Sequence, residues 1–133
     1  MKNIRIRIVS VNLVALAFLI MLPGVANGKP YYSFNDRCRK AYNYTTSMKF
    51  DKANDLLKQE KLNRSNNLIA DYIELYAYCL KAYLEETTST YNSYFKKRDK
   101  VLSRIKNSGA SPYKNFCKAD IYMQSAAINL KRK

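Results

Sequence analysis

The chain has 133 residues, with 24 lysine and arginine residues against 10 aspartate and glutamate residues, and its formal net charge is +14. It has no histidine, which excludes histidine-based catalytic triads and the common zinc sites. The excess of positive charge favours anionic partners, but lysine residues scattered over solvated helix faces are the simpler explanation.

The first 28 residues predict a secretory signal peptide. They combine a basic lead, an apolar run at residues 8–22 and small residues at Ala26 and Gly28. The run of about 15 residues is shorter than the roughly 20 that span a bilayer. We therefore expect cleavage after Ala26 or Gly28, and an uncleaved membrane anchor is the alternative.

Residues 29–133 are expected to form a single domain. Removal of the leader takes away three basic residues, which leaves 21 basic against 10 acidic residues and a net charge of +11. The three remaining cysteines, Cys38, Cys79 and Cys117, lie far apart and at no metal-ligand spacing. We interpret them as small buried residues on helix faces, with one disulfide and one free thiol as the alternative.

The domain is predicted to be entirely helical, because only Pro30, Gly109 and Pro112 interrupt it and apolar residues recur every three to four positions. The first helix is expected at residues 33–48, capped by Ser33 or Asn35. Its apolar stripe consists of Phe34, Cys38, Ala41, Tyr42 and Thr45.

A second helix is predicted to begin at Asp51 and to end before the polar turn at residues 63–66. Its inward residues are expected to be Ala53, Leu56, Leu57 and Leu62. The third helix, from Asn66 or Asn67 to Glu86, has two adjacent apolar stripes: Leu68, Tyr72, Leu75, Cys79 and Tyr83, and Ile69, Ile73, Tyr76, Leu80 and Leu84. So wide an apolar arc indicates a central helix that is contacted on more than one side.

The fourth helix is expected at residues 90–107, with Gly109 in the left-handed conformation after its end. Its inward residues are predicted to be Tyr91, Tyr94, Phe95, Leu102 and Ile105. Ser111 and Pro112 then form a strong start signal, because serine caps a helix and proline suits its first position. The fifth helix follows and runs to the basic C-terminus, and the five helices suggest stacked antiparallel hairpins in which the last has no companion.

Small and aromatic residues recur along these helices. Ala41 precedes Tyr44 by three positions, and Ala119 precedes Tyr122 in the same way, at an offset of 78 residues. Together with Phe34, Phe50, Ala53 and Leu57, the first pair resembles a tetratricopeptide repeat. Arg37, Ala41 and Ser65 stand where that repeat has tryptophan, glycine and proline.

The stretch from Phe50 to Gln124 also resembles the amino-terminal region of exported repeat proteins of Bacteroidetes. The segments that carry this resemblance are residues 50–53, 69–84, 111–113 and 119–124. It implies a short tetratricopeptide-like solenoid in the periplasm or cell envelope of a Gram-negative bacterium. The Bacteroidetes proteins continue with further helices.

By this resemblance, the first helix of each pair would line a concave surface that binds a protein or peptide partner. The residues expected there are Asn35, Cys38, Tyr42, Thr45, Tyr113, Phe116, Asp120 and Met123. A second hypothesis is self-association through the unpaired last helix, where Ile121, Ile128 and Leu130 would otherwise face water. A third is a basic surface that binds anionic polymers such as nucleic acid, lipid headgroups or glycans; of these we least expect nucleic acid, and we expect membrane contact only with an uncleaved leader.

No arrangement of residues predicts catalysis. Glu85 and Glu86 are adjacent and diverge around their helix, and Asp51 and Asp55 are more simply solvated partners of nearby lysines. We therefore expect a non-enzymatic protein without a cofactor or a metal.

Overall fold

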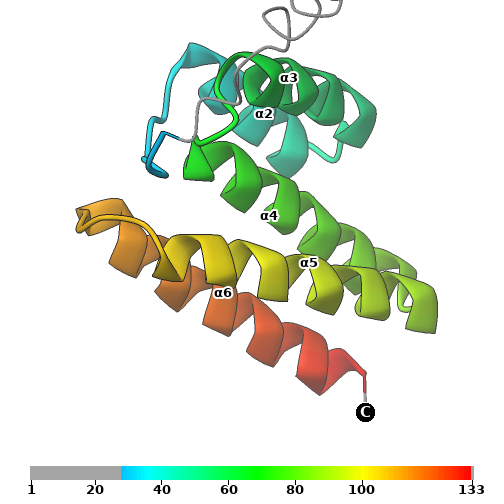
Figure 1. The fold of residues 1–133 in the computed structure, drawn as a ribbon. Helices are drawn as coiled ribbons and strands as arrows, with labels where there is room; N and C mark the ends of the chain where they lie inside the picture. Colours follow the sequence, from blue (N-terminus) through cyan, green and yellow to red (C-terminus); the bar gives the residue numbers. More distant parts are fainter. Residues whose placement is uncertain (1–27, 133) are drawn as a thin grey trace, which may run out of the picture.

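The computed structural model describes residues 28–132, and the predicted signal peptide lies almost wholly outside them. The described part is all-α, apart from a single β-bridge between Tyr31 and Asn67. Figure 1 shows its helices following one another through the molecule in chain order. They are α2 (Asp36–Thr46), α3 (Phe50–Asn63), α4 (Leu68–Glu85), α5 (Thr88–Lys106) and α6 (Pro112–Lys131).

The helix starts follow the capping residues of the sequence. Asn35 caps α2 by accepting from the Cys38 amide at 3.0 Å, and Asn67 caps α4 by accepting from the Ile69 amide at 3.2 Å. Ser111 caps α6 in the same way, with Pro112 in its first turn, as predicted. Each cap supplies an oxygen to an amide that has no partner inside its helix.

The turn between α2 and α3 contains a strained residue. Met48 has a φ of 58°, in the left-handed region that L side chains rarely adopt. Its amide donates to the Thr45 carbonyl at 3.0 Å, and the Lys49 amide donates to the Tyr44 carbonyl at 2.8 Å. These two bonds form the Schellman arrangement that usually has glycine at this position. Gly109, by contrast, was expected to be left-handed and is not, because α5 ends earlier, at Lys106.

The central position predicted for the third helix is confirmed. α4 contacts α2, α3, α5 and α6, and it holds nearly half of the buried apolar residues of the core. In addition, α2 packs on α3, α4 packs on α5, and α5 packs on α6. The apolar side chains at the start of α4, from Leu68 to Ile73, are buried, whereas Tyr78, Tyr83 and Leu84 further along it are exposed.

Ionic side chains join α3, α4 and α5 beside this core. Asp71 of α4 pairs with Lys61 of α3 at 3.1 Å and also with Arg104 of α5. Glu74, one turn further along α4, pairs with Lys61 and with Lys97. The carboxylates of α4 thereby bridge the helices on both sides of it.

Several predictions of burial are confirmed and others are wrong. Ala53 and Leu57 of α3 and Tyr91, Tyr94 and Ile105 of α5 are buried as expected. Leu62 was predicted to face inward, yet it is 85% exposed, because it lies on the side of α3 away from α4. Ile121 and Ile128 were expected to face water, yet both are fully buried, because α6 turns them toward the core.

The three cysteines are free and buried, as the preferred interpretation predicted. Cys38 lies on α2, Cys79 on α4 and Cys117 on α6. Burial raises the pKa of each thiol to about 11. They behave as small apolar residues of the core.

Candidate binding groove

An apolar groove of about 250 Å³ lies where α2 and α6 both pack against α4. We call it the aromatic groove, because five of its seven lining residues are aromatic. It is lined by Phe34, Tyr42, Ile69, Tyr72, Tyr113, Phe116 and Cys117.

The segment before α2 brings Phe34 to the groove. The Tyr31 amide donates to the Asn66 carbonyl, and the Leu68 amide donates to the Tyr31 carbonyl at 2.8 Å. Ser33 is held at both backbone groups by the side chain of Asn67: its amide donates to Oδ1 at 3.0 Å and its carbonyl accepts from Nδ2 at 2.8 Å. The start of α4 therefore fixes the chain on either side of Tyr32.

Buried ion pairing anchors the same segment to α3. The carboxylate of Glu60 accepts hydrogen bonds from Asn35 at 2.7 Å and from Asn67 at 2.9 Å, and it also pairs with Arg37 and Arg64. Burial opposes ionisation of Glu60, but these bonds and the two arginines outweigh it and hold the pKa of Glu60 below its usual value. The carboxylate is therefore charged and fully satisfied.

Ring contacts connect the helices that line the groove. Tyr42 of α2 stacks on Tyr76 of α4 with 6.0 Å between ring centroids, and Phe34 meets Tyr42 edge to face at 6.1 Å. Across the groove, Tyr72 of α4 meets Phe116 of α6 edge to face at 6.2 Å. Such pairs favour defined ring orientations, so the groove has a defined shape.

A polar group borders these rings. Tyr72 donates from its hydroxyl to Oδ2 of Asp120 at 2.8 Å, and Gln124 donates from Nε2 to the same oxygen at 2.6 Å. Burial, together with the bond to Asp120, raises the pKa of Tyr72, so its hydroxyl stays protonated and remains a donor. Oε1 of Gln124 is buried and has no hydrogen-bond partner among residues 28–132.

The structure brings four of the predicted partner-binding residues to this region. Tyr42, Tyr113 and Phe116 line the aromatic groove, and Asp120 is bonded to its Tyr72. Tyr113 and Phe116 are about half exposed or more, which leaves their rings accessible to a partner.

The other four predicted residues have different surroundings. Cys38 and Thr45 are fully buried, because α3 and α4 cover α2, so neither residue is at the surface where a partner was expected to contact it. Asn35 is occupied as the cap of α2 and as a donor to Glu60. Met123 is 70% exposed but does not line the groove.

Sequence reasoning missed the contribution of α4 and of the segment before α2. Phe34 and Tyr72 were interpreted as core residues of apolar stripes. Tyr72 is buried in the core as expected but also lines the groove, whereas Phe34 is 40% exposed and lines it from the segment before α2. The wide apolar arc of α4 was the only signal that could have pointed to Tyr72, since a helix contacted on several sides also borders the spaces between its neighbours.

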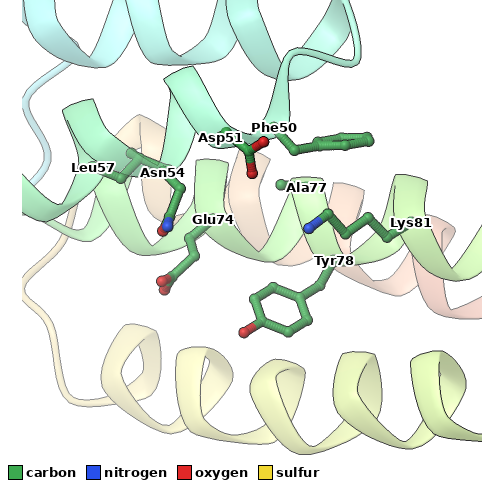
Figure 2. A pocket seen from close by; sticks show the side chains of 8 residues that line it. All are labelled: Phe50, Asp51, Asn54, Leu57, Glu74, Ala77, Tyr78 and Lys81. Atoms are coloured by element: carbon green, nitrogen blue, oxygen red, sulfur yellow. The ribbon is translucent and has the colours of Figure 1, made fainter.

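A second concavity, of about 180 Å³, lies between α3 and α4 and is more polar. Figure 2 shows Lys81 and Phe50 on the same side of this concavity, and the Lys81 ammonium lies 5.2 Å from the centroid of the Phe50 ring. Glu74, at the other end of this concavity in Figure 2, is already paired with Lys61 and Lys97. Glu74 and Lys81 are engaged within the protein, whereas Asp51 forms no ion pair with the described residues. This smaller and more polar concavity offers less apolar surface to a ligand than the aromatic groove.

The side of α6 that faces away from the core is apolar. It presents exposed residues at spacings of three and four, the pattern of a helix that packs on another helix. We call it the outer stripe, and it consists of Phe116, Ala119, Met123, Ala126 and Leu130. Three of these residues occupy, at the offset of 78, the same positions as Cys38, Ala41 and Thr45 of α2, which α3 and α4 bury.

The described residues show neither a metal site nor a membrane span. Between residues 28 and 132, no cluster of three or more cysteine and acidic side chains could hold a metal ion. No helix in that range combines the length and the apolar character that a bilayer span requires. Comparison of the chain with protein-family models, with curated proteins and with solved structures gives no match.

Proposed function

We propose that this protein is a non-catalytic helical-repeat module that binds a protein or peptide partner in the aromatic groove. The observation that carries this proposal is an accessible, ring-lined groove shared by α2, α4 and α6. These are the helices that open successive pairs, and in repeat proteins such helices line the binding surface. Tyrosine rings suit a wet protein interface because each joins an apolar surface to a hydrogen-bonding tip.

The contacts between helices support a repeat arrangement. α2 packs on α3 and α4 packs on α5, and α2 and α6 both lie against α4. In α6, Phe116, Ala119 and Met123 are exposed, whereas the equivalent residues of α2 are buried. A repeat array would give this difference for a helix that is not covered by another helix pair.

The partner can be sought with the protein as bait in extracts of a bacterial envelope. We expect the wild-type protein to retain a partner, and we expect the double variant Tyr113→Ala, Phe116→Ala to lose it, because both rings are exposed in the groove. Leu62→Ala is the matched control: it removes an exposed apolar side chain from α3, which does not line the groove. Equal recovery by the double variant, or a wild-type bait that retains nothing beyond an unrelated protein used as bait, would refute the proposal.

Export to the envelope is part of the same proposal and depends on residues 1–28, whose structure is outside the described range apart from Gly28. The intact mass of protein recovered from the envelope should correspond to a chain that begins at Asn27 or Lys29. A mass that includes the leader would favour the membrane-anchored alternative.

Binding to anionic polymers is less favoured by the structure. The cations that converge beside α4, namely Lys61, Lys97 and Arg104, are engaged by Asp71 and Glu74. Five further cations lie over aromatic rings. Affinity for heparin that falls steeply with added salt would revive this alternative, because release of counterions makes such binding salt-dependent.

A further inference from the structure

We propose that the aromatic groove recognises a cationic side chain, a lysine or an arginine, of the protein or peptide partner. This inference rests on the proposed function and names the chemistry that the groove selects. It depends on three observations: the rings of the groove, the carboxylate at its edge and the positions of the protein's own cations.

The rings of the groove offer faces that no cation of the described chain covers. Within residues 28–132, cations lie over the rings of Tyr44, Phe50, Tyr78, Tyr83 and Phe95, at 4.3 to 6.0 Å from the centroids. All five of these rings are outside the groove. Stacking on Tyr32 and Tyr76 covers one face each of Tyr113 and Tyr42, and Tyr72 is buried. The more exposed rings, Tyr113 and Phe116, still offer surface to a cation from elsewhere, and grouped aromatic rings attract ammonium groups through their negative faces.

Asp120 supplies the matching negative charge. Six acidic residues in the described range pair with a lysine or an arginine: Asp36, Glu60, Asp71, Glu74, Glu86 and Asp99. Of the other four, Asp51, Asp55 and Glu85 are exposed, and Asp120 alone is partly buried. Its two hydrogen bonds, from Tyr72 and Gln124, both end on Oδ2, and no bond to Oδ1 is found among the described residues.

The carboxylate decides which class of ligand fits. A purely apolar group would fill the space between the rings, but it would remove water from Asp120 without replacing that solvation, which is costly. An anion would be repelled by the same carboxylate. A cation compensates Asp120 and gains from the ring faces at the same time.

The inference is tested by titrating the purified full chain with choline and with N-acetyl-lysine methylamide while following its aromatic carbon–proton NMR signals. The neutral counterparts are 3,3-dimethylbutanol, which has the shape of choline, and N-acetyl-norleucine methylamide. We expect saturable shifts of the Tyr72, Tyr113 and Phe116 signals with the cations and at least tenfold weaker binding of the neutral compounds. We expect N-acetyl-lysine methylamide to bind more tightly than choline, because its ammonium can donate a hydrogen bond to the Asp120 carboxylate and choline has no N–H group. Tighter binding of choline would overturn the assignment to a partner's side chain.

Asp120→Asn should weaken cation binding by about tenfold, because it removes the charge while keeping an oxygen that can accept from Tyr72. Asp55→Asn removes the same charge from an exposed position on α3 and should leave the affinity unchanged. A thermal unfolding midpoint of Asp120→Asn close to that of the wild type would show that the fold is intact. Phe116→Leu keeps an apolar side chain but removes one ring, and it should also weaken binding.

Equal binding of cations and neutral counterparts, or no saturable shift with either cation, would overturn this inference. That failure is distinct from failure of the proposed function. If the double variant Tyr113→Ala, Phe116→Ala still lost its partner in the bait experiment, the groove would remain a binding site, and only its selectivity for cations would be refuted.

Discussion

Nδ2 of Asn67 donates a hydrogen bond of 2.9 Å to Oε1 of Glu60, and both residues are almost completely buried. This contact joins the last turn of α3 to the first residue before α4. The same Asn67 side chain holds Ser33, and Glu60 holds Asn35. One buried pair thus organises the connection between two helices and the segment that carries Phe34 to the aromatic groove.

Replacement of Asn67 by alanine should destabilise the fold by about 3 kcal/mol. The change removes the cap of α4 and deprives a buried carboxylate of a donor, and the loss of a partner from a buried charge is costly. Urea unfolding followed by circular dichroism measures the effect. Asn92→Ala, at an exposed position on α5, is the control and should change the free energy of unfolding by less than about 0.5 kcal/mol.

The stability of the protein should fall as the pH is lowered below 4.5. The pKa of Glu60 and the pKa of Glu74 are held below their ordinary value of 4.5, because hydrogen bonds and ion pairs outweigh the opposing effect of burial. A carboxylate with a lowered pKa in the folded state contributes stability above its unfolded pKa and loses it as the pH falls through the folded pKa. When urea unfolding is measured from pH 7 to pH 2, the unfolding midpoint should decline once the pH falls below 4.5. Glu60→Gln should make this decline shallower. A flat profile would contradict the role given to these ion pairs.

Met48→Gly should stabilise the protein by about 1 kcal/mol. Glycine adopts the left-handed conformation at φ 58° without the steric cost of a Cβ atom, and this gain exceeds its larger loss of entropy on folding. Met48→Ala retains the Cβ atom and should give no comparable gain. An increase in the thermal midpoint for alanine as large as that for glycine would show that the methionine side chain, not the backbone, is the source of the cost.

The three cysteines should react slowly with a disulfide reagent while the protein is folded. Burial raises the pKa of each thiol to about 11, so at pH 8 roughly one in a thousand would be ionised even if the reagent could reach it. Addition of urea beyond the unfolding midpoint should release all three thiols to rapid reaction. Rapid labelling of one thiol in the native protein would place that cysteine at the surface.

The outer stripe of α6 should mediate self-association at micromolar concentrations. Its exposed side chains at helical spacing include Met123 and Leu130, which are 70% and 72% exposed. Because each copy is strongly basic, added salt should strengthen the association by screening repulsion between the two copies. Light scattering or sedimentation should detect the larger species.

The variant Leu130→Glu should return the protein to a monomer, whereas Leu62→Glu, which changes an even more exposed leucine on α3, should not. A monomer at all concentrations and at high salt would exclude self-association through this stripe. Association that weakens with salt would indicate ionic contacts instead.

Local chemistry in the sequence was enough to place the helices. The caps Asn35 and Ser111 and the first-turn Pro112 act within three or four residues of themselves, so their effect is visible without knowledge of the rest of the fold. The wide apolar arc of α4 likewise predicted a helix surrounded by others. The limits of the α-helices consequently lie within a few residues of those expected.

Tertiary structure alone decided which apolar side chains are covered. Leu62 and Ile121 are both apolar residues of amphipathic helices, but only Ile121 faces neighbouring helices. The aromatic groove likewise joins residues from Phe34 to Cys117, which become neighbours only because α2 and α6 both pack against α4. The reason is physical: capping depends on a residue and its near neighbours along the chain, whereas burial depends on which surfaces of distant helices meet.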